Sequence, residues 1–127
     1  MNRIVLDASA ILAVIGGEPG AEKLTPDLLA RAVVSTVNLA EVQTKLVSRG
    51  WTSEQAWEDA TSPVREVVSF REEHARIAGD LVLQTRHLGL SLGDRACLAV
   101  GIALELPVYT AEKAWKKVKV VRIHVIR

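Results

Sequence analysis

Short apolar runs alternate along the chain with longer segments whose apolar positions recur every three or four residues. The runs are rich in β-branched residues and predict strands, which we expect at residues 3–6, 32–35, 66–69, 108–110 and 118–126. The segments between them have helical periodicity, and we expect helices at residues 8–15, 21–30, 36–49, 52–61, 71–86, 91–105 and 111–117.

The regular alternation of strand and helix predicts an α/β fold. Parallel strands joined by helical crossovers form a mostly parallel sheet with helices on both faces. The 127 residues suffice for one domain with its own core. The sequence shows no internal repeat or linker, so we expect a single domain over residues 1–127.

Four acidic residues fall where parallel α/β sheets bind ligands, beyond the carboxyl ends of the strands. Asp7 directly follows the first predicted strand, and Glu112 follows the fourth by two residues. Glu41 lies in the second turn of the helix after the second strand, and Asp94 lies in the first turn of the helix before the fourth. If strands one and four are neighbours, the carboxylates converge. A divalent cation relieves their repulsion, and carboxylate oxygens suit Mg²⁺ or Mn²⁺.

Each acid also has an ordinary structural interpretation. Asp7 can cap the following helix, and Ser91 with Asp94 fits a capping box. Glu112 falls in a first helical turn, and Glu41 has a lysine four residues on. The functional interpretation therefore depends on the four acids meeting at one edge of the sheet.

Composition and charge narrow the class of protein, its expected location and its possible partners. Hydrophobic residues make up 49% and charged residues 24% of the chain, as in globular proteins. The single cysteine, Cys97, rules out an intrachain disulfide, and no signal peptide or membrane span is predicted, so we expect a cytoplasmic protein. Net charge is +1, but residues 113–127 carry six Lys or Arg and no acid. This basic tail could bind a polyanion or protect an edge strand, and charge alone does not separate the two.

Four motifs, in order along the chain, resemble those of PIN-domain nucleases. They are IVLDASAIL at 4–12, STVNLAEV at 35–42, LSLGDRA at 90–96 and YTAEKAW at 109–115. Length and pattern look most like the VapC-type toxins of toxin–antitoxin pairs. The resemblance implies a three-layer α/β/α fold with a sheet ordered 3-2-1-4-5. It also implies a homodimer, an antitoxin partner and Mg²⁺-dependent cleavage of RNA.

The resemblance also assigns site residues. The three main acids and three supporting positions of the family match Asp7, Glu41, Asp94, Ser9, Asn38 and Thr110. The family's fourth acid is most often Asp, whereas this chain has Glu112, whose longer side chain leaves direct, water-mediated and second-metal roles open.

The implied mechanism is hydrolysis of an RNA phosphodiester bond. Asp7 and Asp94 are expected to hold Mg²⁺, and Glu41 to orient the attacking water. We expect RNA-backbone contacts from Lys45, Arg49, Arg95, Lys113, Lys116 and Lys117. Two alternatives remain: a non-catalytic module that binds RNA or antitoxin, and a DNA-cutting relative of the flap nucleases.

The other notable side chains are expected to be structural. The three histidines have no mutual spacing that indicates catalysis or zinc binding. We expect Trp57 and Trp115 to pack in the core and Cys97 to be buried. As an alternative, Trp51 and Trp57 could form a groove that binds an antitoxin helix.

Overall fold

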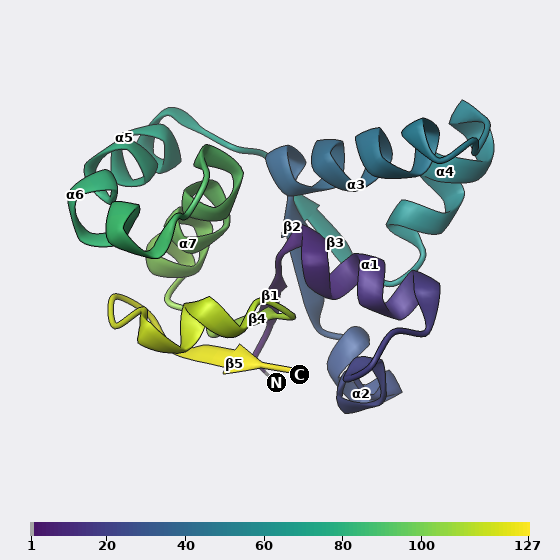
Figure 1. Ribbon diagram of the computed structural model, residues 1–127, viewed down its shortest axis with the longest axis horizontal. Helices are drawn as coiled ribbons and strands as arrows, with labels where there is room; N and C mark the ends of the chain where they lie inside the picture. Colours follow the sequence, from purple (N-terminus) through teal and green to yellow (C-terminus); the bar gives the residue numbers. More distant parts are fainter. Residues whose placement is uncertain (1) are drawn as a thin grey trace.

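A parallel five-stranded sheet forms the centre of the structure, which is a computed structural model (Figure 1). It describes residues 2–127, so residue 1 of the predicted domain lies outside the described residues. The strands are β1 (Ile4–Leu6), β2 (Ala32–Ser35), β3 (Glu66–Val68), β4 (Val108–Thr110) and β5 (Ile123–Val125). They are all parallel and lie in the order β3-β2-β1-β4-β5. The predicted fold class and strand order are confirmed.

Helices cover both faces of this sheet (Figure 1). One layer contains α1 (Ala8–Gly16), η1 (Ala21–Lys23), α2 (Pro26–Leu29), α3 (Thr36–Ser48) and α4 (Ser53–Thr61). The other contains α5 (Glu72–Asp80), α6 (Val82–Thr85), η2 (Arg86–Leu88), α7 (Leu92–Leu104) and η3 (Lys113–Lys117). Among residues 2–127, no helix is long and apolar enough to span a membrane.

The two helical layers explain why the central strands are apolar throughout. In β1, Ile4 and Leu6 pack in the core on the side of α1 and α3, whereas Val5 packs on the side of α7. In β2, Val34 packs on the side of α1 and α3, and Val33 packs on the side of α7. A strand buried on both faces requires a continuous apolar run, which is the pattern in the sequence.

Some predicted elements differ in extent from those observed. The predicted helix at 71–86 is interrupted after α5, following Gly79 and Asp80, two residues of low helix propensity. The predicted last strand at 118–126 is reduced to β5, because its partner β4 offers only three residues for pairing. The helix predicted at 21–30 is divided into the 3₁₀ helix η1 and the short α2, and the helix predicted at 111–117 is the shorter 3₁₀ helix η3.

Candidate active site

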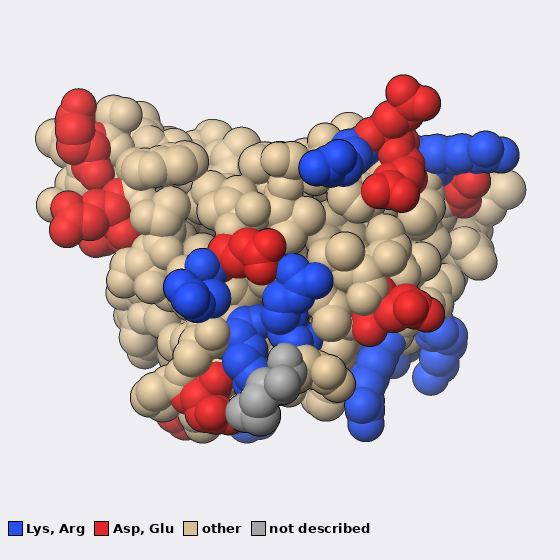
Figure 2. Space-filling model, turned by 180° about the vertical axis from the view of Figure 1, so that it is seen from behind, with Lys and Arg blue, Asp and Glu red and all other residues tan. Residues whose placement is uncertain are grey.

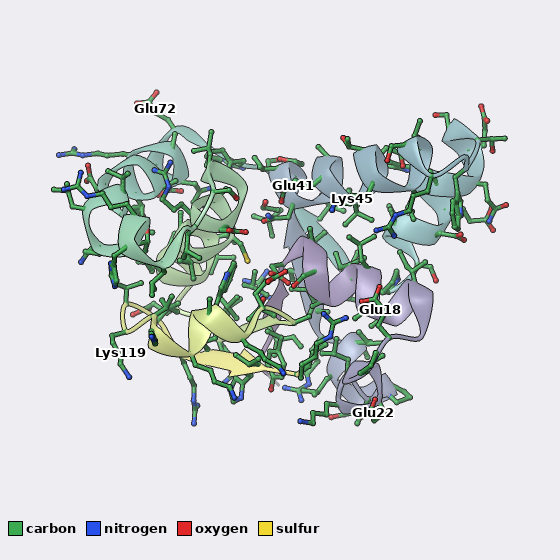
Figure 3. All side chains as sticks on the ribbon, viewed as in Figure 1. Glu18, Glu22, Glu41, Lys45, Glu72 and Lys119 are labelled. Atoms are coloured by element: carbon green, nitrogen blue, oxygen red, sulfur yellow. The ribbon has the colours of Figure 1, made fainter. Side chains whose placement is uncertain are left out.

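A cavity of about 290 Å³ is lined by residues that follow β1 and β4, by α3 from its second turn onward and by the first turn of α7. All four predicted acids line it: Asp7, Glu41, Asp94 and Glu112. Figure 3 shows Glu41 and Lys45 on α3, with Glu18 beyond the end of α1. The structure therefore brings together acids that are up to 105 residues apart in the chain, because β1 and β4 are neighbours in the sheet.

Asp7 lies at the centre of this site and is only 3% exposed. It caps α1, since its Oδ1 accepts a hydrogen bond from the Ala10 amide at 2.8 Å. The hydroxyls of Ser9 and Thr110 donate to its carboxylate at 2.8 Å and 2.7 Å. Burial and, to a smaller extent, the negative charge of Asp94 raise the pKa of Asp7 to about 7, against the lowering effect of these hydrogen bonds.

Ser9 and Thr110 also organise the backbone after β4. The Ser9 hydroxyl oxygen accepts from the Ala111 amide at 2.9 Å, and the Thr110 hydroxyl oxygen accepts from the Glu112 amide at 3.0 Å. The two predicted supporting residues thus connect the ends of β1 and β4. The Glu112 side chain is exposed at the cavity and lies on the turn that these bonds fix.

Glu41 is held by Asn38, the third predicted supporting residue. Asn38 Nδ2 donates to Glu41 Oε1 at 2.8 Å, and Asn38 Oδ1 accepts from the Ser35 hydroxyl at 2.8 Å. Ser35 also caps α3, because its hydroxyl oxygen accepts a hydrogen bond from the backbone amide of Asn38. Burial raises the pKa of the half-buried Glu41; Asn38 opposes this effect, and the charge of Asp94 adds to it.

Asp94 forms the capping box that its sequence pattern predicts. Its Oδ2 accepts from the Ser91 amide at 2.9 Å, and the Ser91 hydroxyl oxygen accepts from the Asp94 amide at 3.2 Å. The structural and functional interpretations of Asp7 and Asp94 are therefore compatible, since both residues cap helices and both line the cavity.

The chemistry of these side chains fits a hard divalent cation. The cavity presents carboxylate oxygens and no His or Cys, and two of its acids have pKa values raised by burial and by a neighbouring negative charge. A cation offsets both effects. In the described part of the chain, no three His, Cys, Asp or Glu side chains already meet in an arrangement that could hold a metal ion. Asp7, Glu41 and Asp94 are instead held by the protein donors described above.

Basic side chains lie beside the acids. Lys45, one turn after Glu41 on α3, and Arg49, which follows the last residue of α3, line the cavity as well. Arg127 also lines the cavity and forms an ion pair with Glu18. Its Nε donates a hydrogen bond to the backbone carbonyl of Pro19 at 3.1 Å. Sequence reasoning missed this pair, because the two residues are 109 positions apart and belong to no recognised motif.

The other predicted RNA contacts lie elsewhere. Arg95 is turned toward α5, where its Nη1 donates to the Ala78 carbonyl at 2.9 Å. The exposed lysines of η3 are not among the residues that line the cavity: Lys113, Lys116 and Lys117. On the face opposite to that of Figure 1, basic and acidic side chains are interspersed (Figure 2). Only Lys45 and Arg49, of the six basic candidates, adjoin the acidic cavity.

The tryptophans divide between core and surface. Trp115 is 1% exposed and packs in the core, as predicted. The prediction for Trp57 is wrong: the residue is 51% exposed, because α4 buries Ala56 and Ala60 on its inner face. Trp51 is 37% exposed and donates from Nε1 to Asp59 at 2.9 Å.

The predictions for two other notable side chains are confirmed. His74 is buried, and its Nδ1 accepts from the Arg71 amide, so it is a satisfied structural histidine. Cys97 is also buried, within the core on the side of α7.

The fold and the acidic cavity define an α/β protein with a candidate site whose side chains suit a divalent cation. The family model of the PIN domain matches residues 4–121, and the chain belongs to the PIN domain family. PIN domains are generally nucleases. A search of curated proteins found no match.

Solved structures of similar fold include three toxin–antitoxin assemblies. DNA-bound VapBC from Salmonella typhimurium matches at 16% identity with a TM-score of 0.78, covering 100% of both chains. VapBC2 from Rickettsia felis, bound to a promoter DNA fragment, matches at 20% identity and TM-score 0.75, covering 96% of this chain and 97% of that one. A toxin–antitoxin complex from Klebsiella pneumoniae matches at 16% identity and TM-score 0.73, covering 98% of each chain. The resemblance to VapC-type toxins is thus confirmed at the level of the fold.

Proposed function

We propose that this PIN domain is a Mg²⁺-dependent endoribonuclease and the toxin of a VapBC-type pair. One observation carries the proposal: Asp7, Glu41 and Asp94, from three different elements, line a single cavity bordered by Lys45 and Arg49. An acidic centre with adjacent cations suits a metal ion and a phosphodiester backbone. Mn²⁺ has the same ligand preference and is expected to substitute for Mg²⁺.

Asp7 and Asp94 would hold the cation, with Glu112 at the edge of the same cavity available in support. A bound divalent cation lowers the pKa of water and neutralises negative charge that develops on the phosphate. Ser9 and Thr110 fix the orientation of the Asp7 carboxylate through the hydrogen bonds they donate to it.

Glu41 acts as the base in this mechanism. Its pKa is raised by burial, which makes it a better proton acceptor than an exposed carboxylate. The proton of the attacking water goes to Glu41, while the water oxygen bonds to phosphorus. The bond from phosphorus to the 3′ oxygen breaks, and that oxygen takes up a proton from solvent water. The products carry a 5′-phosphate and a 3′-hydroxyl. Lys45 and Arg49 contact the phosphate oxygens.

Replacement of Asp7 by Asn tests the assignment directly. Asp7→Asn removes a charge from the centre of the cavity while preserving size, so we expect cleavage of end-labelled RNA in Mg²⁺ to be abolished, and we expect the same for the wild type in EDTA. Asp80→Asn, at the end of α5, is the matched control and should cut normally. Circular dichroism verifies that both variants are folded. Wild-type cleavage by Asp7→Asn would refute the mechanism.

The same preparation decides the class of substrate. Matched single-stranded RNA and DNA of one sequence are digested side by side, and we expect cleavage of the RNA. Cleavage of DNA alone would favour the flap-type alternative. Absence of cleavage, together with absence of Mg²⁺ binding by titration calorimetry, would favour a non-catalytic binding module.

The antitoxin partner and the homodimer are part of the proposal. The similar fold of toxin–antitoxin assemblies supports the partner. Val47, Trp51 and Trp57 are exposed on the hairpin of α3 and α4, and large apolar side chains of this kind anchor partner helices.

Co-expression with the product of a small adjacent gene tests the partner. We expect a stable complex that suppresses RNA cleavage and that Trp57→Ala weakens. Leu83→Ala, at an exposed position on α6, is the control. Light scattering gives the mass of the chain alone, and a monomer would contradict the homodimer.

A further inference from the structure

The carboxylate of Glu41 lies directly against Gly93, the second residue of α7. A Cβ atom at Gly93 would lie 2.5 Å from Glu41 Cδ and 2.8 Å from Glu41 Oε1. Real Cβ atoms essentially never approach other atoms so closely. Glu41 can occupy its observed position only because residue 93 has no side chain.

The backbone of Gly93 is part of the same arrangement. Its carbonyl oxygen accepts from Asn38 Nδ2 at 3.0 Å, and the same nitrogen donates to Glu41 Oε1 at 2.8 Å. Asn38 is buried, and its Oδ1 accepts from the Ser35 hydroxyl. The Asn38 amide therefore has a fixed orientation and ties Glu41, on α3, to the first turn of α7.

The other helical glycines have different surroundings. At Gly101 a Cβ would meet Val108 Cγ2 at 2.6 Å and the Leu106 carbonyl, so this glycine serves the packing of α7 on β4. At Gly79 a Cβ would meet no atom within 4 Å. At Gly16, the last residue of α1, the nearest atoms also belong to a residue that lines the cavity, Glu18, but at 3.3 Å or more. Only at Gly93, among these four glycines, would a Cβ collide with a residue of the acidic cavity.

We propose that Gly93 is a positioning residue for the reaction, one that sets where the Glu41 carboxylate lies relative to Asp94. The inference rests on the proposed function, because it concerns the base of that mechanism. Gly93 precedes Asp94 in α7, so contact between Glu41 and Gly93 fixes the spacing between the carboxylates of two elements that are 53 residues apart. Gly93 carries no reacting group and acts through Glu41.

The first test compares three Gly→Ala variants by steady-state cleavage of RNA. Displacement of a reacting group by about 1 Å costs on the order of 10²-fold, so we expect Gly93→Ala to lose ~10²-fold in kcat with little change in KM. Gly79→Ala should retain wild-type kcat. Gly101→Ala introduces a comparable steric conflict away from Glu41, and it should lower the melting temperature while leaving kcat unchanged below that temperature.

A second test asks whether the loss passes through Glu41. Glu41→Asp withdraws the carboxylate by one methylene and makes room for a Cβ at residue 93. We therefore expect Gly93→Ala to cost less than about 3-fold when it is added to Glu41→Asp, against ~10²-fold in the wild-type background. Equal losses in the two backgrounds would mean that Gly93 acts independently of Glu41, and the proposal would fail.

A third measurement does not depend on activity. The side-chain amide resonances of Asn38 report its bonds to Glu41 and Gly93, and we expect them to shift in Gly93→Ala but not in Gly79→Ala or Gly101→Ala. If the wild type cuts no RNA, the proposed function fails whatever these spectra show. If the wild type cuts RNA while Gly93→Ala keeps wild-type kcat and an unchanged Asn38 amide, the positioning role alone is overturned.

Discussion

Asp7 is the residue at which stability and the proposed function conflict most. It is buried beside Asp94, and the hydrogen bonds from Ser9, Thr110 and Ala10 do not fully offset the loss of solvation, so its pKa is raised to about 7. Such a group favours the folded state only when it is protonated or neutralised by a cation.

The pH dependence of stability follows from this shift. The pKa of Asp7 in the folded state, about 7, lies above the ordinary value of 3.8. Ionised Asp7 therefore destabilises the fold above pH 7, and this penalty disappears as pH falls from 7 toward 4. Without divalent cations, Asp7→Asn should be more stable than the wild type at pH 8, by at most about 4 kcal/mol. The difference should shrink at pH 5.

Urea unfolding in EDTA at the two pH values measures this difference. Asp80→Asn provides the baseline for loss of an ordinary surface carboxylate. A stability difference between wild type and Asp7→Asn that is independent of pH would show that burial does not raise the pKa of Asp7.

Among the elements, the turn between α1 and η1 contains a glycine that is in close contact with a distant part of the chain. Gly20 has a φ of +95°, and a Cβ there would lie 2.8 Å from the Ile126 carbonyl carbon and 3.2 Å from Ile126 Cγ1. Gly50, after α3, has a similar φ of +102° with no atom within 4 Å of a Cβ. Both positions require a positive φ, which favours glycine. Only at Gly20 would a side chain also collide with another residue.

Alanine at these two positions separates the two requirements. Gly50→Ala should cost about 1–2 kcal/mol for the left-handed backbone alone. Gly20→Ala should cost a further ~1–3 kcal/mol, because it also overpacks the contact with Ile126. Equilibrium urea unfolding gives both values. Equal destabilisation of the two variants would contradict the close approach of residues 20 and 126.

For the whole molecule, the arrangement of charge separates two groups of basic residues. Lys45 and Arg49 line the acidic cavity, whereas Lys116 and Lys117 are exposed on η3 and do not line it. If the scissile bond lies at Asp7, as we propose, the first pair lies beside its phosphate and the second pair does not.

Paired substitutions test this division. Lys45→Ala with Arg49→Ala should raise KM for RNA by ~10-fold or more and flatten the dependence of kcat/KM on salt, because two phosphate contacts are lost. Lys116→Ala with Lys117→Ala should change both quantities much less. Cleavage assays between 50 and 200 mM salt (about the range in which such contacts weaken) measure the effect. If the η3 pair alone changed the salt dependence, the RNA path would have to cross the basic tail.

Much of this molecule could be predicted from local pattern. Two-sided burial forces the central strands to be apolar, and acids that follow such strands reach the ligand-binding edge of a parallel sheet. The fold class, the strand order implied by the family resemblance and the location of Asp7, Glu41, Asp94 and Glu112 at one cavity therefore followed from the sequence.

The remaining features depend on which surfaces meet. Periodicity did not show that Trp57 lies on the outer face of α4, or that Arg95 turns to α5. The contact of Glu41 with Gly93 and the ion pair of Glu18 with Arg127 join residues that are 52 and 109 positions apart. Local sequence encodes element type and the polarity of each face, because these depend on near neighbours. Side-chain direction and contacts between distant segments are set by the packing of helices on the sheet, which exists only in the folded chain.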